Sequence, residues 1–169
     1  ARTLRAIATR GKKAFYEGEI AADMVATLRA AGGLHTEEDF ARGADAAEFV
    51  EPISIKWRGL EVFQCPPNGS GMHVLQILGI LGNLQTPEEG AGSALRYHRH
   101  IEAARMVYRD RDAFLADPSM VDVPVAKLTS GDYLKRLAAL IRDDAALPEL
   151  PPAGESDLAK HKDTVYLCV

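Results

Sequence analysis

One segment constrains the fold more than any other. Residues 72–84, MHVLQILGILGNL, are apolar on most sides of a helix. A helix with one apolar stripe lies at a surface, whereas a helix that is apolar all round is buried. We therefore expect a buried helix here. Its longest apolar run, around Val74 to Leu81, is far shorter than the roughly 20 residues of a bilayer span, so it predicts no membrane segment.

Apolar positions repeat at helical spacing in several further segments. This spacing predicts helices over residues 3–10 and 13–30, with Gly11 between them. The pair Gly32-Gly33 then supplies a left-handed stop.

Three side chains have the character of helix N-caps. Thr36, with Asp39 three residues later, forms a capping-box pattern in which Asp replaces the usual Glu. Ser93 begins a long helix that runs to about Leu115, and Ser130 begins a last one. The inward stripe predicted for the long helix consists of Tyr97, Ile101, Ala104 and Tyr108.

Residues 51–65 change to an alternating period. The runs ISIKW and LEVFQC flank Arg58-Gly59, which predicts a β-hairpin that Pro66-Pro67 ends. From 145 to 162 the composition shifts to prolines and mixed charges, which is typical of a linker with little to bury. Residues 164–169 then alternate like a strand. The fold class is therefore mainly α with one β-hairpin.

Composition excludes some classes of function. The 169 residues carry a net charge of -4 without a basic stripe, so we expect no nucleic-acid partner. His98 and His100 would point about 200° apart on a helix, so they predict no shared metal site. Cys65 and Cys168 either pair or remain two free, half-buried thiols. We expect no cofactor and no metal.

Two further patterns have a structural and a functional interpretation. The stretch PPNGSGM, residues 66–72, opens a helix with free backbone N–H groups, which either bind an anion or form a structural turn. It lacks the Gly-Lys-Ser/Thr of a P-loop. The run Arg109-Asp110-Arg111-Asp112 is typical of a solvated helix face, in which Arg111 or Asp112 could be buried.

Thr164 stands where the linker becomes the last strand. A β-branched residue is ordinary at that position. His161 nearby is either a base for a neighbour or a solvated side chain. The residue types alone do not distinguish these readings.

Four stretches together resemble the γ-glutamyltransferase family of N-terminal-nucleophile hydrolases, in the family's order and over nearly the whole chain. They are GKKAFYEGEIAADMVATLRAAGGLHTEEDF, EPISIKWRGLEVFQCPPNGSGMHVLQILGILGNL, YRDRDAFLADPSMVDVPVAKLTSGDYLKRL and ESDLAKHKDTVYLCV. The resemblance implies that this chain is a piece of a precursor with an αββα core. It implies a mainly helical large-subunit region over 1–144, a processing linker over 145–163 and the first small-subunit strand over 164–169.

The resemblance also implies a reaction. The precursor cuts itself between Asp163 and Thr164, and Thr164 becomes the nucleophile. Its hydroxyl needs a base beside it, and the freed α-amine, with a pKa near 7.7 to 8.0, supplies one on the same residue. The implied partners are the small subunit from the same precursor, a γ-glutamyl donor such as glutathione, and a water, amino acid or peptide acceptor. Export is the family-level expectation for bacterial relatives.

The sequence departs from the family's pattern at two places. The family's Thr-Thr-His-aromatic-Ser-Val stands here as TVYLCV, residues 164–169, and its Pro-Ser-Ser-Gly-Gly as NGSGM, residues 68–72. Val165 in place of the second Thr favours a divergent member. A cephalosporin (glutaryl) acylase and a scaffold relative that never cleaves remain the alternatives. The resemblance places the substrate-binding and oxyanion residues outside this chain, so none is assigned.

Overall fold

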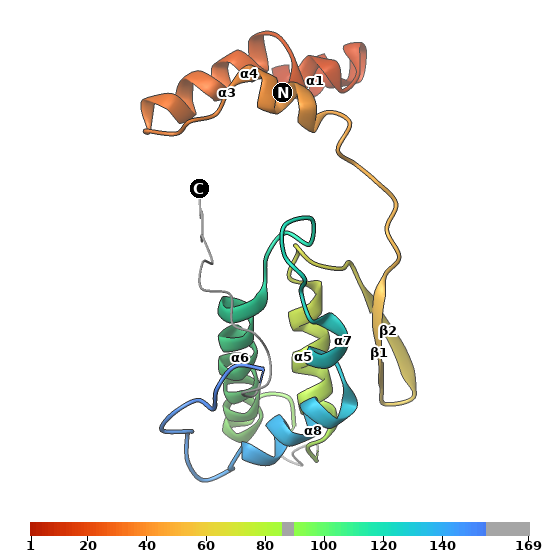
Figure 1. Cartoon of the computed structure of the whole chain (residues 1–169), viewed down its shortest axis with the longest axis vertical. Coiled ribbons are helices and arrows are strands. Elements are labelled where there is room, and N and C mark those ends of the chain that lie inside the picture. The colour runs from red at the N-terminus through yellow and green to blue at the C-terminus, as the bar shows by residue number, and fades with distance from the viewer. Residues whose placement is uncertain (86–89, 155–169) are drawn as a thin grey trace. The chain divides into compact units, whose positions relative to one another are not determined.

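The computed structural model describes residues 1–85 and 90–154, which belong to two compact units, one of residues 1–49 and one that begins at residue 50 (Figure 1). The predictions for His161, Asp163, Thr164, Cys168 and the strand 164–169 lie outside the described residues.

The first unit is helical. Its helices are α1 (Arg2–Arg10), α2 (Lys13–Tyr16), α3 (Glu19–Ala30) and α4 (Glu37–Gly43). The single helix predicted over 13–30 is therefore wrong. Gly18 has a φ of 76°, in the left-handed region, which a right-handed helix cannot contain. The first helix therefore ends as α2, and a second helix, α3, begins after Gly18.

Both helix signals that follow α3 are confirmed. Gly32 has a φ of 89°, and the N–H of Gly33 donates to the carbonyl of Leu28 at 2.8 Å, as in a Schellman motif. Thr36 then caps α4: the N–H of Asp39 donates to the Thr36 Oγ at 3.2 Å, and the Thr36 N–H donates to the Asp39 carboxylate at 2.9 Å.

The second unit begins with the predicted hairpin. Strands β1 (Ile53–Trp57) and β2 (Leu60–Gln64) pair antiparallel, with Trp57 opposite Leu60. Arg58 and Gly59 have φ angles of 51° and 82°, as a type I′ turn requires. Cys65, expected to be half-buried, is free and exposed because it lies just beyond the last paired residue.

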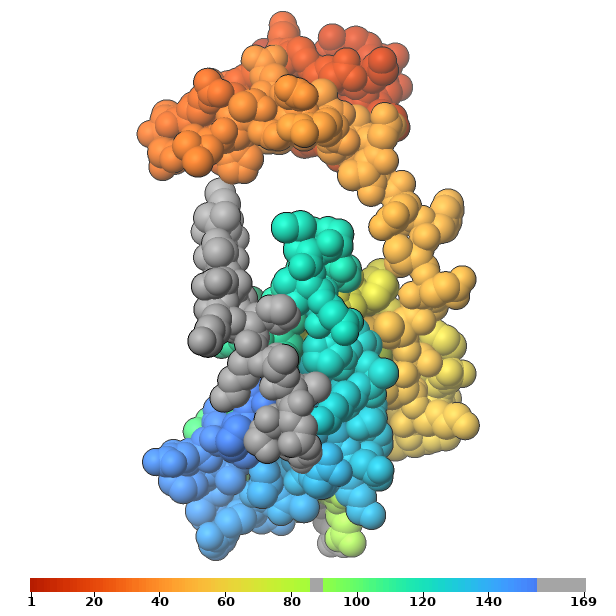
Figure 2. All heavy atoms as spheres, in the orientation of Figure 1, coloured from red at the N-terminus to blue at the C-terminus, as the bar shows by residue number. Residues whose placement is uncertain are grey.

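The described residues of this unit also form four helices, α5 (Gly71–Gly82), α6 (Ala94–Phe114), α7 (Val125–Leu128) and α8 (Gly131–Leu140). Helices α5 and α6 run side by side, and α8 packs against α5 (Figure 1). The hairpin packs against α5, and in Figure 2 its yellow spheres stand beside the cyan spheres of the α7–α8 segment. The predicted caps are confirmed, since Ser93 accepts from the Arg96 N–H at 3.2 Å and Ser130 from the Tyr133 N–H at 3.3 Å.

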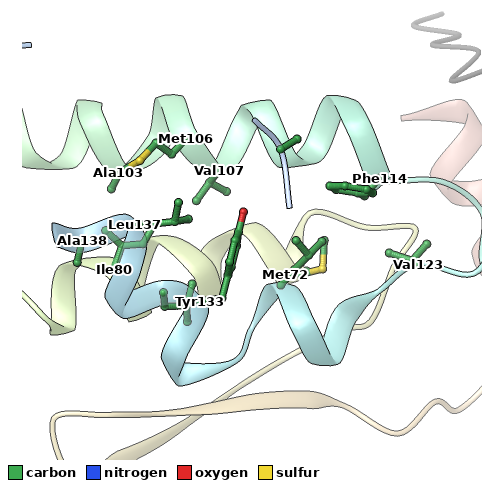
Figure 3. Close-up of a cluster of buried hydrophobic side chains, with 13 residues drawn as sticks. Met72, Ile80, Ala103, Met106, Val107, Phe114, Val123, Tyr133, Leu137 and Ala138 are labelled. Atoms are coloured by element: carbon green, nitrogen blue, oxygen red, sulfur yellow. The ribbon is translucent and has the colours of Figure 1, made fainter. Parts of the chain in front are cut away.

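The hydrophobic core lies between α5, α6 and α8 (Figure 3). Helix α5 is buried as predicted, although Val74 remains 44% exposed. Buried apolar residues come from these three helices, from the connection between α6 and α8, which includes α7, and from the segment after α8: Met72, Ile80, Ala103, Met106, Val107, Phe114, Val123, Leu128, Tyr133, Leu134, Leu137, Ala138 and Ala153.

The stripe predicted to face inward on α6 is wrong. Tyr97, Ile101 and Tyr108 are 61%, 58% and 54% exposed within the described part of the chain. The face that packs on α5 carries Ala103, Met106, Val107 and Phe114 instead. That face also contains the buried acids Glu102 and Asp110. A search for apolar residues at helical spacing does not identify this face as buried, because it assigns charged residues to the surface.

Gly79 on α5 lies directly against Leu134 of α8. A Cβ there would lie 2.3 Å from the Leu134 Cδ1 and 3.6 Å from the Ile55 Cδ1. We expect Gly79→Val to lower the free energy of unfolding by about 2 kcal/mol, because the extra atoms overpack the core. Urea unfolding checks this. Gly131→Ala, where an added Cβ meets nothing within 4 Å, is the control and should not destabilise. Equal midpoints for wild type and Gly79→Val would contradict the packing argument.

His73 on α5 is 4% exposed, and neither ring nitrogen has a hydrogen-bond partner among the described residues. Burial lowers the pKa of His73, and the charge of Arg111 adds to that effect. The unfolded chain therefore binds a proton at His73 more readily than the folded chain does, so stability falls as pH drops below about 6.5.

We expect the urea midpoint to be lower at pH 5.5 than at pH 7. The difference should be smaller in His73→Gln, because the imidazole, whose pKa differs between the folded and unfolded states, has been removed. Parallel urea titrations at both values measure it. If the midpoint decreased by the same amount in His73→Gln as in wild type, His73 would not contribute to the pH dependence of stability.

Candidate functional site

The structure describes the chain up to Gly154, ten residues before Thr164. The cleavage at Asp163-Thr164 therefore stays a prediction. What the structure does show is how the segment that leads to this junction is held.

Residues 147–154, called the strap below, differ from the expectation of a linker with little to bury. Leu147 and Leu150 pack against the core, and Ala153 is only 7% exposed. Apolar residues between the prolines explain the difference, because each gains free energy by covering the helices. The strap is therefore part of the packed unit.

The strap is first attached to α6 at Leu147. Its N–H donates to the Glu102 Oε2 at 2.9 Å, and its carbonyl accepts from both Arg105 terminal nitrogens at 3.1 Å. Arg105 and Glu102 also form an ion pair at 2.7 Å. Burial by itself would raise the pKa of Glu102, but the Leu147 N–H and Arg105 outweigh it and hold that pKa below its usual value.

Arg109 makes the second attachment, one helical turn further along α6. Its Nη1 donates to the carbonyl of Pro151 at 2.8 Å, while its Nη2 pairs with Asp110 at 2.6 Å. Residues 102, 105 and 109 are spaced three and four apart, so they lie on one face of the helix. That face follows the backbone of the strap.

The third attachment centres on Asp110, which is completely buried. Its Oδ2 accepts from the Tyr133 hydroxyl at 2.7 Å and from the Gln76 Nε2 at 3.1 Å. Its Oδ1 accepts from Arg109 and from the Gly154 N–H at 3.2 Å. A buried carboxylate is costly unless it is paired and hydrogen-bonded, and both conditions are met here.

Tyr133 connects α8 to the same carboxylate. Its hydroxyl points toward α6 (Figure 3) and also accepts from the Arg109 Nη2 at 2.9 Å and from the Gly154 N–H at 3.2 Å. Burial first, and then the hydrogen bond to Asp110, raises the pKa of Tyr133 far above its usual value. The phenol therefore remains a proton donor to Asp110.

The prediction for the charged run 109–112 is corrected by this arrangement. Asp110 is the buried member and the Arg109 side chain is 11% exposed, whereas Asp112 is 67% exposed. Sequence reasoning also missed Glu102, Arg105 and Tyr133. Charged residues at 102, 105 and 109, interleaved with Ala103 and Met106 on a helix, were the available signal.

The remaining candidates have structural explanations. The His98 Nε2 hydrogen-bonds the Arg142 carbonyl at 2.6 Å, and the described residues contain no group of three or more His, Cys, Asp or Glu that could hold a metal ion. Gly71 opens α5 tightly against the end of the hairpin, because a Cβ there would lie 2.4 Å from the Cys65 carbonyl oxygen. This supports the interpretation of the glycine-rich stretch as a structural turn.

No helix within residues 1–85 and 90–154 is long and apolar enough to cross a membrane.

Comparison with known proteins places the chain in a family. The family model described as gamma-glutamyltranspeptidase matches residues 1–169. The glutathione hydrolase proenzyme of Escherichia coli (strain K12) is 37% identical over 174 residues, which cover 100% of this chain and 29% of that protein.

Two solved structures are similar. The Helicobacter pylori gamma-glutamyltranspeptidase superposes with a TM-score of 0.74 at 31% identity, over 96% of this chain and 46% of that one. A cephalosporin acylase from Bacillus halodurans superposes with a TM-score of 0.69 at 35% identity, over 89% of this chain and 27% of that one. The chain spans about 30% of the length of the curated relatives it matches. A family model that matches every residue, together with these relatives, shows that the chain belongs to the gamma-glutamyltranspeptidase family.

Proposed function

We propose that the protein containing this chain is a self-processing enzyme that transfers or hydrolyses γ-glutamyl groups of glutathione and similar amides. One observation carries the proposal: the family match extends through residue 169 and therefore includes Thr164. The name proenzyme, borne by the relative from Escherichia coli, supports processing of a precursor.

The bonds that form and break in self-cleavage all lie at the junction. The Thr164 Oγ attacks the carbonyl carbon of Asp163 and its proton passes to the Thr164 nitrogen. The C–N bond breaks, and Asp163 is left as an ester on Thr164. Water hydrolyses the ester, which gives a new carboxylate at Asp163 and a free α-amine and hydroxyl at Thr164. The products are a large subunit that ends at Asp163 and a small subunit that begins at Thr164, together forming an αββα heterodimer.

Turnover then uses both groups of Thr164. The α-amine takes the proton of the hydroxyl as the Oγ attacks the γ-amide carbonyl of the donor. The tetrahedral intermediate collapses to a γ-glutamyl ester and releases the protonated amine. Water or an acceptor amine opens the ester and regenerates Thr164. Donors for the oxyanion and for the substrate carboxylate come from parts of the protein outside this chain.

A second candidate is a glutaryl acylase. It is favoured by the similarity to the cephalosporin acylase from Bacillus halodurans and by Val165, which replaces the family's second Thr. Both candidates use the same nucleophile and differ in the pocket that receives the acyl chain. A scaffold relative that never cleaves would need no Thr at position 164.

The first test is cleavage of the full-length protein. We expect two bands on a denaturing gel, with the smaller one beginning at Thr164 by N-terminal sequencing. Thr164→Ala should give a single band because the attacking oxygen is gone, whereas Thr164→Ser should still cleave. A wild-type precursor that stays intact on long incubation would favour the scaffold instead.

The second test separates the two acylases by donor. A γ-glutamyl anilide and a glutaryl anilide differ only in the α-amino group. A site that hydrogen-bonds this group rejects the analogue that lacks it by about 10²-fold or more, so we expect kcat/KM to favour the γ-glutamyl anilide by at least that factor. The opposite preference would support the glutaryl acylase.

A further inference from the structure

The strap is held by contacts that the proposed chemistry of Thr164 does not use. Its three attachments follow one another along α6: Leu147 on Glu102 and Arg105, Pro151 on Arg109, and Gly154 on Asp110 with Tyr133. Every one of them holds a backbone group of the strap through a side chain of a helix. The strap is therefore fixed in position by polar contacts as well as by its apolar side chains.

The last attachment is the most elaborate. The Gly154 N–H is shared between the Asp110 Oδ1 and the Tyr133 hydroxyl, both at 3.2 Å. Gly154 is buried and has a φ of 63°, so the chain changes direction there in a conformation that favours glycine. The path of the backbone is thus defined at the point where it leaves the packed unit.

Stability alone is a weak reason for this cluster. An apolar set of similar volume in place of a buried Asp–Arg pair is often as stable or more so. Gln76, Arg109 and Tyr133 hold the Asp110 carboxylate in one orientation, and that carboxylate and the Tyr133 hydroxyl then fix the Gly154 N–H in one place, which apolar packing does not do. Asp110 and Tyr133 therefore fit a positioning role.

Position matters because of the chain that follows. Ten residues lead from Gly154 to Thr164, whereas 24 lead from the end of α8 at Leu140 to Thr164. Because an extended chain spans at most about 3.6 Å per residue, this ten-residue tether keeps the junction within about 36 Å of Gly154, against about 86 Å from Leu140. Any restriction on orientation narrows this range further.

We propose that Asp110 and Tyr133 are positioning residues for self-cleavage, because they anchor Gly154 and so deliver the Asp163-Thr164 bond to the rest of the processing site. This inference rests on the proposed function, since it assumes that the junction is cut. Neither residue touches the reacting atoms in the proposal. Their effect is on the rate of processing and not on the chemistry of the mature Thr164.

The decisive experiment compares two insertions of the same ten Gly/Ser residues in the full-length protein. Inserted after Gly154, they double the tether and should slow cleavage about threefold or more. Inserted between Ala145 and Ala146, which are both exposed and precede the strap, they leave the anchored tether unchanged and should cleave at the wild-type rate. Pulse–chase labelling of the precursor measures both rates.

A point variant tests the anchor itself. Tyr133→Phe removes one of the two oxygens that accept from the Gly154 N–H. If Gly154 is released, the last attachment becomes Pro151, 13 residues before Thr164, so cleavage should slow by about 1.5-fold. Tyr97→Phe, on an exposed residue of α6, is the matched control and should cleave like wild type. The kcat of molecules that have cleaved should equal the wild-type value in Tyr133→Phe, whereas general damage to the fold would lower kcat as well.

The outcomes separate this proposal from the proposed function. If wild type cleaves before Thr164 while the insertion after Gly154 and Tyr133→Phe cleave equally fast, the positioning role is wrong and the function stands. Equal slowing by both insertions would also overturn it, because the strap would then not act as an anchor. If wild type does not cleave at all, the proposed function itself fails.

Discussion

The second unit depends on one buried carboxylate. Asp110 on α6 receives hydrogen bonds from Gln76 on α5, from Tyr133 on α8 and from the backbone of the strap at Gly154. A carboxylate removed from water has to find such partners, since leaving it unpaired would cost several kcal/mol. The apolar core fills the space between the three helices, and Asp110 requires a particular relative placement of them.

The same carboxylate links packing to the proposed chemistry. An N-terminal threonine acts only after its amine has been freed, so processing precedes every turnover. A bond that cuts itself must be presented in a productive geometry, and the chain just before it is where the protein has control over that geometry. In our proposal, the strap, held at Leu147, Pro151 and Gly154, gives the large subunit a fixed point from which to present the junction.

Local signals in the sequence predicted much of the fold. The caps at Thr36, Ser93 and Ser130 and the turn at Arg58-Gly59 are as expected, because each depends on a few neighbouring residues. The break at Gly18 was missed because a glycine inside a helical pattern is often tolerated. The wrong stripe on α6 has another cause: the true inward face carries Glu102 and Asp110, and a hydrophobic pattern assigns charged residues to the surface.

The sequence by itself determined the family, through motifs spread over the whole chain, and it singled out Thr164 as the expected nucleophile by that resemblance. It also predicted that the helix within residues 72–84 is largely buried. Only the tertiary structure decided which acid of the run 109–112 is buried, and that residues 147–154 are bound to α6. The reason is physical: the burial of a charge depends on donors that come from distant segments, and no local pattern records whether those donors arrive.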